Sequence, residues 1–248
     1  MQNNNPLKGI NYFFKGFSLI IQPGIRQWVL IPLLINIFLF SLLIYLGWLQ
    51  FQTLIEIITV QLQTWLPNWI IKMIDWLILP LFIMIALIAV FFTFTFLANL
   101  ISAPFNGLLA TAVEKYLTKK EPEIPYQPWY KLMSSMIWSP IEKLLYYLRW
   151  VIILIILSLI PPINIISPIL WFIFGAWMVS LEYAAASGEN HGHKAPAIRQ
   201  ILAKKRMLVL GFGSGILVGM LIPVVNFLIM PVAVAGATCM WVYEFVEK

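Results

Sequence analysis

The sequence predicts an all-α integral membrane protein with two long transmembrane helices, two re-entrant (hemi-penetrating) helical hairpins, and interfacial amphipathic helices. Three observations predict this class. The chain of 248 residues is 61% hydrophobic and only 10% charged, whereas soluble domains carry roughly 25% charged residues. Two long runs, 27–55 and 76–113, contain no charged residue, and two later apolar runs are each interrupted by prolines. We expect a single membrane domain over residues 1–248.

The first spanning helix is predicted over residues 27–55, after an amphipathic segment at 6–22. In that segment apolar residues recur at helical spacing, while Lys8 and Lys15 fall largely on the other face. This pattern is typical of a helix lying in the membrane interface. The 29 residues of the run would extend roughly 43 Å as a helix, against a hydrocarbon core of about 30 Å, so the run can span the membrane.

The second spanning helix is predicted over residues 76–113, with 79–97 as the section that crosses. The preceding loop, 56–75, combines tryptophans with charged residues, which indicates an aromatic belt at an interface. Residues 114–149 form the most polar region of the chain, and we interpret them as an aqueous or interfacial connector.

Two similar units follow, at 150–181 and 207–243. Each contains the pattern I-P-x-x-N followed by another proline, and the apolar arms beside these turns have only about 11 to 17 residues. Such arms extend roughly 17–25 Å as helix, which is mostly too short to cross a bilayer. Apolar turns are acceptable at membrane depth where protein covers them. We therefore predict two re-entrant hairpins, with four short or tilted full spans as the alternative.

The basic residues are distributed asymmetrically along the chain. Of the sixteen Lys and Arg residues, only Lys72 lies in the 56–75 loop; the others lie in the N-terminal segment, 114–149, 182–206 and the C-terminal tail. The positive-inside rule places these basic segments on the cytoplasmic side. The net charge of +6 therefore fits a membrane surface better than nucleic acid. One part, 193–206, has a basic face and an apolar face and predicts a second interfacial helix.

The stretch from Gln22 to Trp28, at the head of the first span, is the leading candidate for a functional site. Pro23 and Gly24 break the preceding segment, and a helix can start directly after them. The first amides of a helix are free and carry the positive end of its dipole. Arg26 adds a full positive charge in the same turn. Together they favour an anion site; the alternative is a turn followed by an interfacial anchor.

Signals of catalysis and of metal binding are weak. His191 and His193 lie beside Glu189, but that loop holds no further histidine and the single cysteine, Cys239, is distant and fits a packing role. No Ser-His-acid set and no acidic cluster for metal-assisted chemistry is visible. We expect neither an enzyme nor a cofactor. The glycines within 211–219 lack the Lys-Ser/Thr of a phosphate loop and favour close helix packing instead.

Isolated polar residues in the apolar segments form a second set of candidates. Such groups are costly in hydrocarbon, so they face protein, water or a transport pathway. For the asparagines the alternative is a hydrogen bond that caps a broken helix, and for the glutamate it is an interfacial position. The pathway candidates are Asn36, Asn99, Asn106, Glu114, Asn164 and Asn226.

Several stretches together resemble one family, the CysZ-type bacterial sulfate permeases. The resemblance runs in order over nearly the whole chain. It rests on the combination of P-G-[IL]-R, A-P-F-N-G-L-L and I-P-x-x-N…M-P-V-A-V-x-G-A-T. The matching stretches are 12–36, 101–114, 168–177, 190–191 and 222–241.

The resemblance implies a permease that carries sulfate, or a related oxyanion such as sulfite, across the bacterial inner membrane to feed cysteine biosynthesis. It also implies a homo-oligomer among membrane lipids, with the sulfate site at Gly24, Ile25, Arg26 and Gln27. Many members carry a second arginine where this chain has Gln27. The competing interpretation is a membrane-embedded scaffold, insertase or lipid-acting protein that uses the same basic site to bind a lipid phosphate.

Overall fold

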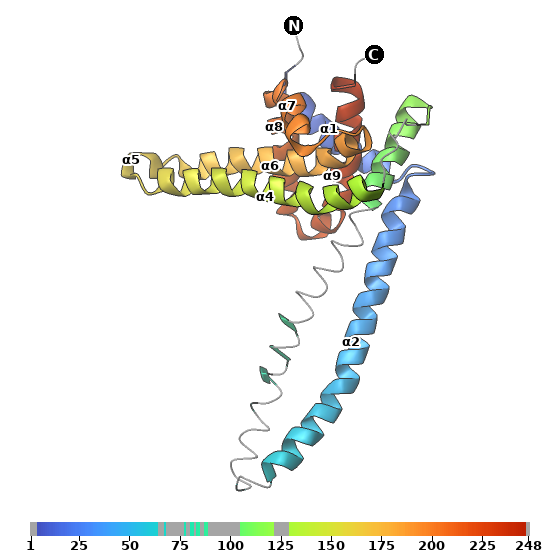
Figure 1. The fold of residues 1–248 in the computed structure, drawn as a ribbon, viewed down its shortest axis with the longest axis vertical. Helices are drawn as coiled ribbons and strands as arrows, with labels where there is room; N and C mark the ends of the chain where they lie inside the picture. The colour runs from blue at the N-terminus through green and yellow to red at the C-terminus, as the bar shows by residue number, and fades with distance from the viewer. Residues whose placement is uncertain are drawn as a thin grey trace. The chain divides into compact units, whose positions relative to one another are not determined.

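The structure is a computed structural model that describes residues 4–63, 67, 77, 80–81, 83–84, 87–88, 105–121 and 129–246. Over these residues all regular secondary structure is helical, as the sequence predicts. Residues 105–118 form one helix. The other helices are α1 (Pro6–Ile20), α2 (Arg26–Gln63), α4 (Trp129–Ser158), α5 (Pro161–Asn164), α6 (Ser167–Asn190), α7 (Ala195–Ala203), α8 (Arg206–Met220) and α9 (Pro223–Glu244) (Figure 1).

The chain divides into two compact units, which we describe separately. The first comprises Met1–Val29 and Phe105–Lys248, and the second comprises Leu30–Pro104. The described part of the second unit is mainly α2, which continues through Pro32. The predicted single membrane domain stays a prediction.

Among the residues that the structure describes, two helices are long and apolar enough to cross a membrane. They are the Arg26–Gln50 part of α2 and the whole of α6. The first corresponds to the span predicted at 27–55, and only 6% of its apolar window is buried, as expected of a helix that lipid or other protein covers. Most of the second predicted span, 76–113, lies outside the described residues, and Asn99 lies there too.

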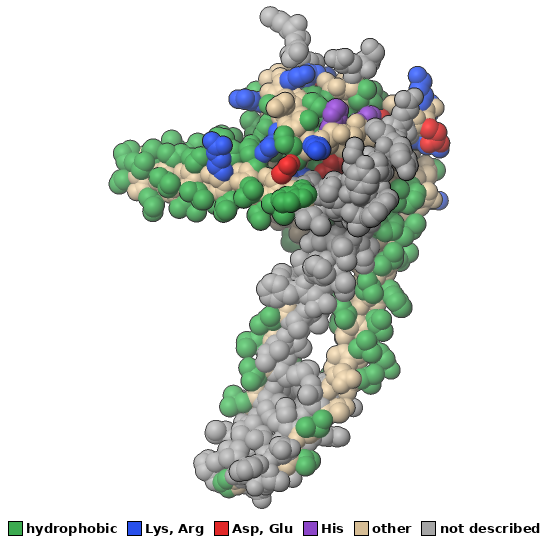
Figure 2. Space-filling model, in the orientation of Figure 1, with side chains coloured by type: hydrophobic (Ala, Val, Ile, Leu, Met, Phe, Trp, Pro, Cys, Tyr) green, Lys and Arg blue, Asp and Glu red, His purple; other side chains and the backbone are tan. Residues whose placement is uncertain are grey.

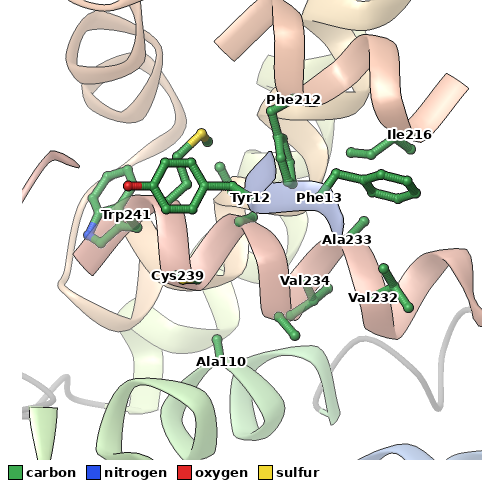
Figure 3. Packing of buried hydrophobic residues seen from close by; sticks show 14 of the residues in the cluster. Tyr12, Phe13, Ala110, Phe212, Ile216, Val232, Ala233, Val234, Cys239 and Trp241 are labelled. Carbon is green, nitrogen blue, oxygen red and sulfur yellow. The ribbon is translucent and has the colours of Figure 1, made fainter. Parts of the chain in front are cut away.

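The core of the first unit lies where α1 packs against α8 and α9. Tyr12 and Phe13 of α1 are each 3% exposed, and Figure 3 shows them among side chains of the other two helices. The helices approach closely because glycines face neighbouring backbone. A Cβ on Gly9 would overlap a backbone oxygen of α8, and one on Gly211 would overlap a backbone oxygen of α1. The packing role predicted for the glycines within 211–219 is therefore confirmed.

The amphipathic helices α1 and α7 bury apolar surface inside the protein. Ile198 and Leu202 of α7 are 2% and 0% exposed, and both belong to the same core cluster as the buried residues of α1. The helices predicted at 6–22 and 193–206 are thus present, and part of their apolar surface contacts protein. Their position at the membrane interface stays a prediction. Cys239 is also buried, as expected of a packing residue.

The hairpin predicted at 150–181 corresponds to α4 and α6, which lie side by side with the short α5 at their far end (Figure 1). The predicted arm lengths are wrong, because α4 has 30 residues and α6 has 24. Both helices continue beyond the apolar run through charged residues such as Lys143 and Glu182. A helix of the length of α6 extends about 36 Å, so length does not argue against a full crossing.

The hairpin predicted at 207–243 corresponds to α8 and α9, which are joined at Leu221 and Ile222. Here α8 has 15 residues and α9 has 22, with Pro231 inside the second helix. The length of α8 is about 22 Å, which is less than the hydrocarbon thickness. The re-entrant course of this hairpin stays a prediction.

Candidate functional site

The candidate site is the turn that connects α1 to α2. Gln22 organises its backbone: the Gln22 N–H donates to the carbonyl of Leu19 at 3.0 Å, and the Gln22 carbonyl accepts the N–H groups of Ile25 and Arg26, each at 3.1 Å. Gly24 has a φ of +87°, a left-handed conformation that glycine adopts without steric cost. The helix begins at Arg26, directly after this turn, as the sequence predicts.

Consecutive side chains of the turn divide between core and surface. Ile25 is 1% exposed and belongs to the core cluster, whereas Gly24, Arg26 and Gln27 are exposed. A buried anchor therefore presents a positive charge at the surface. Within the described residues the Arg26 guanidinium has neither an ion pair nor a hydrogen bond. It is available to an external anion.

The amides of the turn differ in part from the prediction. The N–H of Ile25, predicted as a free donor, instead donates to Gln22, and so does that of Arg26. The N–H of Gly24 makes no backbone hydrogen bond within the described part of the chain. The donors left for an anion are therefore the Gly24 N–H, the Arg26 guanidinium and the side-chain amide of Gln27.

The helix over residues 105–118 joins this turn to the end of α6. Its first residue, Phe105, lies with its ring centroid 6.4 Å from that of Trp28. The side-chain amide of Asn190 donates to the carbonyl of Gly107 at 2.9 Å and to the hydroxyl of Thr111 at 3.0 Å. Three stretches that carry the family resemblance, far apart in the sequence, thus meet in one place.

One turn further along this helix, Glu114 pairs with His191. The His191 Nε2 lies 3.0 Å from the nearer carboxylate oxygen, and Glu114 is only 7% exposed. The ring of His191 also stacks on Trp241, with centroids 6.4 Å apart. The hydrogen bond to Glu114 raises the pKa of His191 and outweighs desolvation, which lowers it. The pair therefore favours a charged histidine.

A second buried carboxylate, Glu244 at the end of α9, was not found from the sequence. Its side chain is 4% exposed and accepts from Lys8 at 2.5 Å, Lys205 at 2.7 Å and the Tyr12 hydroxyl at 2.8 Å. Burial acts to raise the pKa of Glu244, but the hydrogen bonds from Lys205, Lys8 and Tyr12 outweigh it and lower the pKa. No sequence signal marks this cluster, because Tyr12 is 232 residues distant from Glu244.

The predicted pathway residues do not gather at one point. Of those described, Glu114 alone is buried; Asn36 of α2 and Asn106 are half-buried, and Asn164 and Asn226 are exposed. The alternative role as helix caps is not seen for Asn164 and Asn226: the N-caps of α5 and α9 are Ile160 and Ile222, and neither asparagine side chain makes a hydrogen bond within the described part of the chain. Among the residues that the structure describes, no group of three or more His, Cys, Asp or Glu is placed to hold a metal ion.

Comparison with known proteins extends over nearly the whole chain. A model of the family described as Sulfate transporter CysZ/Etoposide-induced protein 2.4 matches residues 12–231. A protein of Pseudomonas aeruginosa (strain LESB58) named Sulfate transporter CysZ is 38% identical over 245 residues, which cover 98% of this chain and 97% of that protein.

Relatives from other bacteria carry the same name. One from Pseudomonas fluorescens (strain Pf0-1) is 40% identical over 241 residues, covering 96% of this chain and 94% of that protein. One from Pectobacterium atrosepticum is 37% identical over 239 residues, covering 96% and 85%. The resemblance inferred from the motifs is therefore confirmed, and the chain belongs to the Sulfate transporter CysZ/Etoposide-induced protein 2.4 family.

Proposed function

We propose that this chain transports sulfate across the bacterial inner membrane and thereby supplies cysteine biosynthesis. The observation that carries the proposal is the exposed Arg26, which the Gly24 turn presents without a partner among the described residues. This arrangement occurs in a chain whose relatives are named sulfate transporters. Transport needs no catalytic constellation, and the described residues offer no metal-binding cluster for one.

In the proposed site, Arg26 binds the sulfate dianion through two parallel N–H···O bonds, the geometry that a guanidinium offers to an oxyanion. The Gly24 N–H adds a third donor close to the positive end of the α2 dipole. Gln27 donates a neutral hydrogen bond where many family members have a second arginine. One full charge at an exposed site gives weak, readily reversible binding, which suits a permease because the ion must also leave.

The finer membrane arrangement is also part of the proposal. We place α1 and α7 at the interface, both hairpins in the bilayer as re-entrant elements, and the basic segments on the cytoplasmic side of a homo-oligomer. The tip of the α4–α6 hairpin supports this, because Leu159 and Ile165 there are 77% and 83% exposed. The polar side chains near the tip are hydrogen-bonded within the protein: the Ser158 hydroxyl lies 2.6 Å from the Ser167 hydroxyl and accepts a hydrogen bond from the indole N–H of Trp171 at 3.3 Å. Such internal pairing is needed in hydrocarbon, where no water can bind these groups.

This topology places Arg26 on the cytoplasmic face. For sulfate that enters from outside, the site is then an exit or regulatory contact. The half-buried Asn36 and Asn106, the buried Glu114 and the hairpin residues Asn164 and Asn226 are the polar groups that we propose for the path.

Labelled-sulfate uptake into liposomes containing only the purified protein tests the proposed function. We expect uptake above that of protein-free liposomes. The competing function, a scaffold, insertase or lipid-acting protein, predicts no sulfate flux in the same vesicles. Altered lipid or protein products without flux would favour the insertase or lipid-acting protein, and absence of sulfate binding would favour the scaffold.

A further inference from the structure

A basic pocket that shares no lining residue with the Arg26 turn lies between α4, α6 and α7. Its polar lining consists of Lys143, Tyr146 and Tyr147 from α4 and Arg199 from α7. Its apolar floor includes Leu181 of α6, which is 6% exposed. Lys143 belongs to the basic segment 114–149 and Arg199 to the basic segment 182–206. These two segments, far apart in the sequence, thus meet at one site.

Arg199 is prepared to bind an oxyanion. Its guanidinium lies 4.2 Å from the centroid of the Tyr146 ring, and stacking on a ring leaves the N–H edge of the fork open. The Tyr146 hydroxyl accepts a hydrogen bond from Trp177 at 3.2 Å, so its own hydrogen remains to be donated. Within the described residues Arg199 has no carboxylate partner.

The charges around the pocket favour an anion with one negative charge. Lys143 pairs with Glu189 at 3.3 Å, and Tyr147 donates to Glu182 at 3.2 Å. Both carboxylates therefore contact lining residues of the pocket, and Glu189 offsets the charge of Lys143, so among the described lining residues Arg199 supplies the cation that is left for a ligand. A dianion such as sulfate would bring one negative charge more than Arg199 balances. A phosphate diester carries one charge and fits better.

The surface beside the pocket is apolar. On α4, Trp150 and Ile153 lie seven residues after the pocket residues Lys143 and Tyr146, on the same face of the helix, and are 43% and 37% exposed. Figure 2 shows hydrophobic side chains continuing along the α4–α6 hairpin, with basic side chains over the rest of the first unit. A ligand with a charged head and long apolar chains matches both parts.

We propose that this pocket binds the headgroup phosphate of an anionic phospholipid, whose acyl chains lie along the exposed Trp150 and Ile153 of α4. The phosphate oxygens accept from Arg199, Lys143 and the Tyr146 hydroxyl. Such a lipid would hold α7 against the α4–α6 hairpin at the membrane surface. The proposal is independent of sulfate binding at Arg26.

Native mass spectrometry of the full-length protein, with phosphatidylglycerol and phosphatidylcholine at equal concentration, tests the proposal. We expect preferential retention of phosphatidylglycerol and about tenfold weaker retention in Arg199→Gln, since charged hydrogen bonds of this kind are lost. Arg199→Lys keeps the positive charge but loses the paired N–H donors of the guanidinium, so its retention of phosphatidylglycerol should lie between that of the wild type and that of Arg199→Gln. The control Lys194→Gln removes an exposed charge one residue before α7 that does not line the pocket, and should retain the lipid.

Three results would overturn the assignment. They are equal retention of both lipids by the wild type, equal loss in Arg199→Gln and Lys194→Gln, and displacement of phosphatidylglycerol by free sulfate or inorganic phosphate. Thermal unfolding without anionic lipid identifies a variant that does not fold. If Arg199→Gln is such a variant, Lys143→Gln takes its place, with the same expected loss of preference and the same contradicting outcome.

Discussion

Glu114 and His191 form an ion pair between residues 77 positions apart, with 3.0 Å between the imidazole nitrogen and the carboxylate. Asn190 adds two hydrogen bonds from the adjacent position, to Gly107 and Thr111. These contacts fix the 105–118 helix to the end of α6. Because Phe105 of the same helix contacts Trp28, the pair also supports the surface that presents Arg26.

The pair makes stability depend on pH. The pKa of His191 is raised in the folded protein, so its contribution is complete below the unfolded value of about 6.5 and is lost as the pH rises through the folded pKa. We expect His191→Asn to lower the melting temperature more at about pH 5.5 than at about pH 8. His193→Asn, which leaves the pair intact, is the matched control. A melting-temperature difference that does not change with pH would contradict this assignment.

The cluster around Glu244 predicts the opposite dependence of stability on pH. The pKa of Glu244 is lowered in the folded protein, so the stabilisation is present above the unfolded pKa of about 4.5 and is lost as the pH falls through the folded pKa. We expect Glu244→Gln to reduce the free energy of unfolding by about 2 kcal/mol at neutral pH, because Lys8 and Lys205 lose a buried partner. Chemical denaturation in detergent measures this change.

Glu121→Gln is the control for that experiment. Glu121 pairs with Lys115, but its side chain is 75% exposed, and surface ion pairs contribute about 0–1 kcal/mol. Equal losses in both variants would show that burial at Glu244 does not matter.

Gly24 should be needed for its backbone conformation alone. A Cβ there would have no atom within 4 Å, but the φ of +87° is strained for any L side chain. Gly24→Ala should therefore cost about 1 kcal/mol of stability and weaken sulfate binding by altering the turn before Arg26. Gly47→Ala in α2 also meets open space, without positive φ, and should be neutral or stabilising. Unchanged sulfate affinity in Gly24→Ala would mean that the turn does not position the anion.

A second positive charge at position 27 should strengthen the site. Gln27→Arg places a guanidinium next to Arg26, and a further charge about 4 Å from the anion contributes about 1 kcal/mol in water, or about fivefold in affinity. Isothermal titration with sulfate at low salt measures the gain. Gln200→Arg, an exposed position on α7, adds the same charge elsewhere. A similar gain in both variants would reflect net charge alone.

The local pattern of the sequence predicted the elements of the fold well. Apolar periodicity located α1 and α7, and the Pro-Gly pair located the start of α2. The arms of the 150–181 hairpin were measured on its apolar runs alone, and these runs are shorter than the helices that contain them. Helix α4 continues through Lys143, and the charge of Lys143 is paired with that of Glu189 on α6.

The site was predictable only where it is local. Ile25, Arg26 and Gln27 follow one another, so a dipole and a charge could be placed together from the sequence. The partners of Glu114 and Glu244 could not be found in this way, because they depend on which helices pack together. Close packing through Gly9 and Gly211 determines that arrangement, and a single sequence does not show which glycines face each other.

The central claim is that Arg26 binds the sulfate that this chain transports. Labelled-sulfate uptake into liposomes should be compared for the wild type, Arg26→Ala and Arg206→Ala. Arg206 is the matched control, because it is also an exposed arginine at the first position of an apolar helix. We predict that Arg26→Ala lowers uptake at limiting sulfate by about tenfold, since a charged hydrogen-bonding partner is lost, and that Arg206→Ala transports like the wild type. Wild-type uptake by Arg26→Ala would contradict the account.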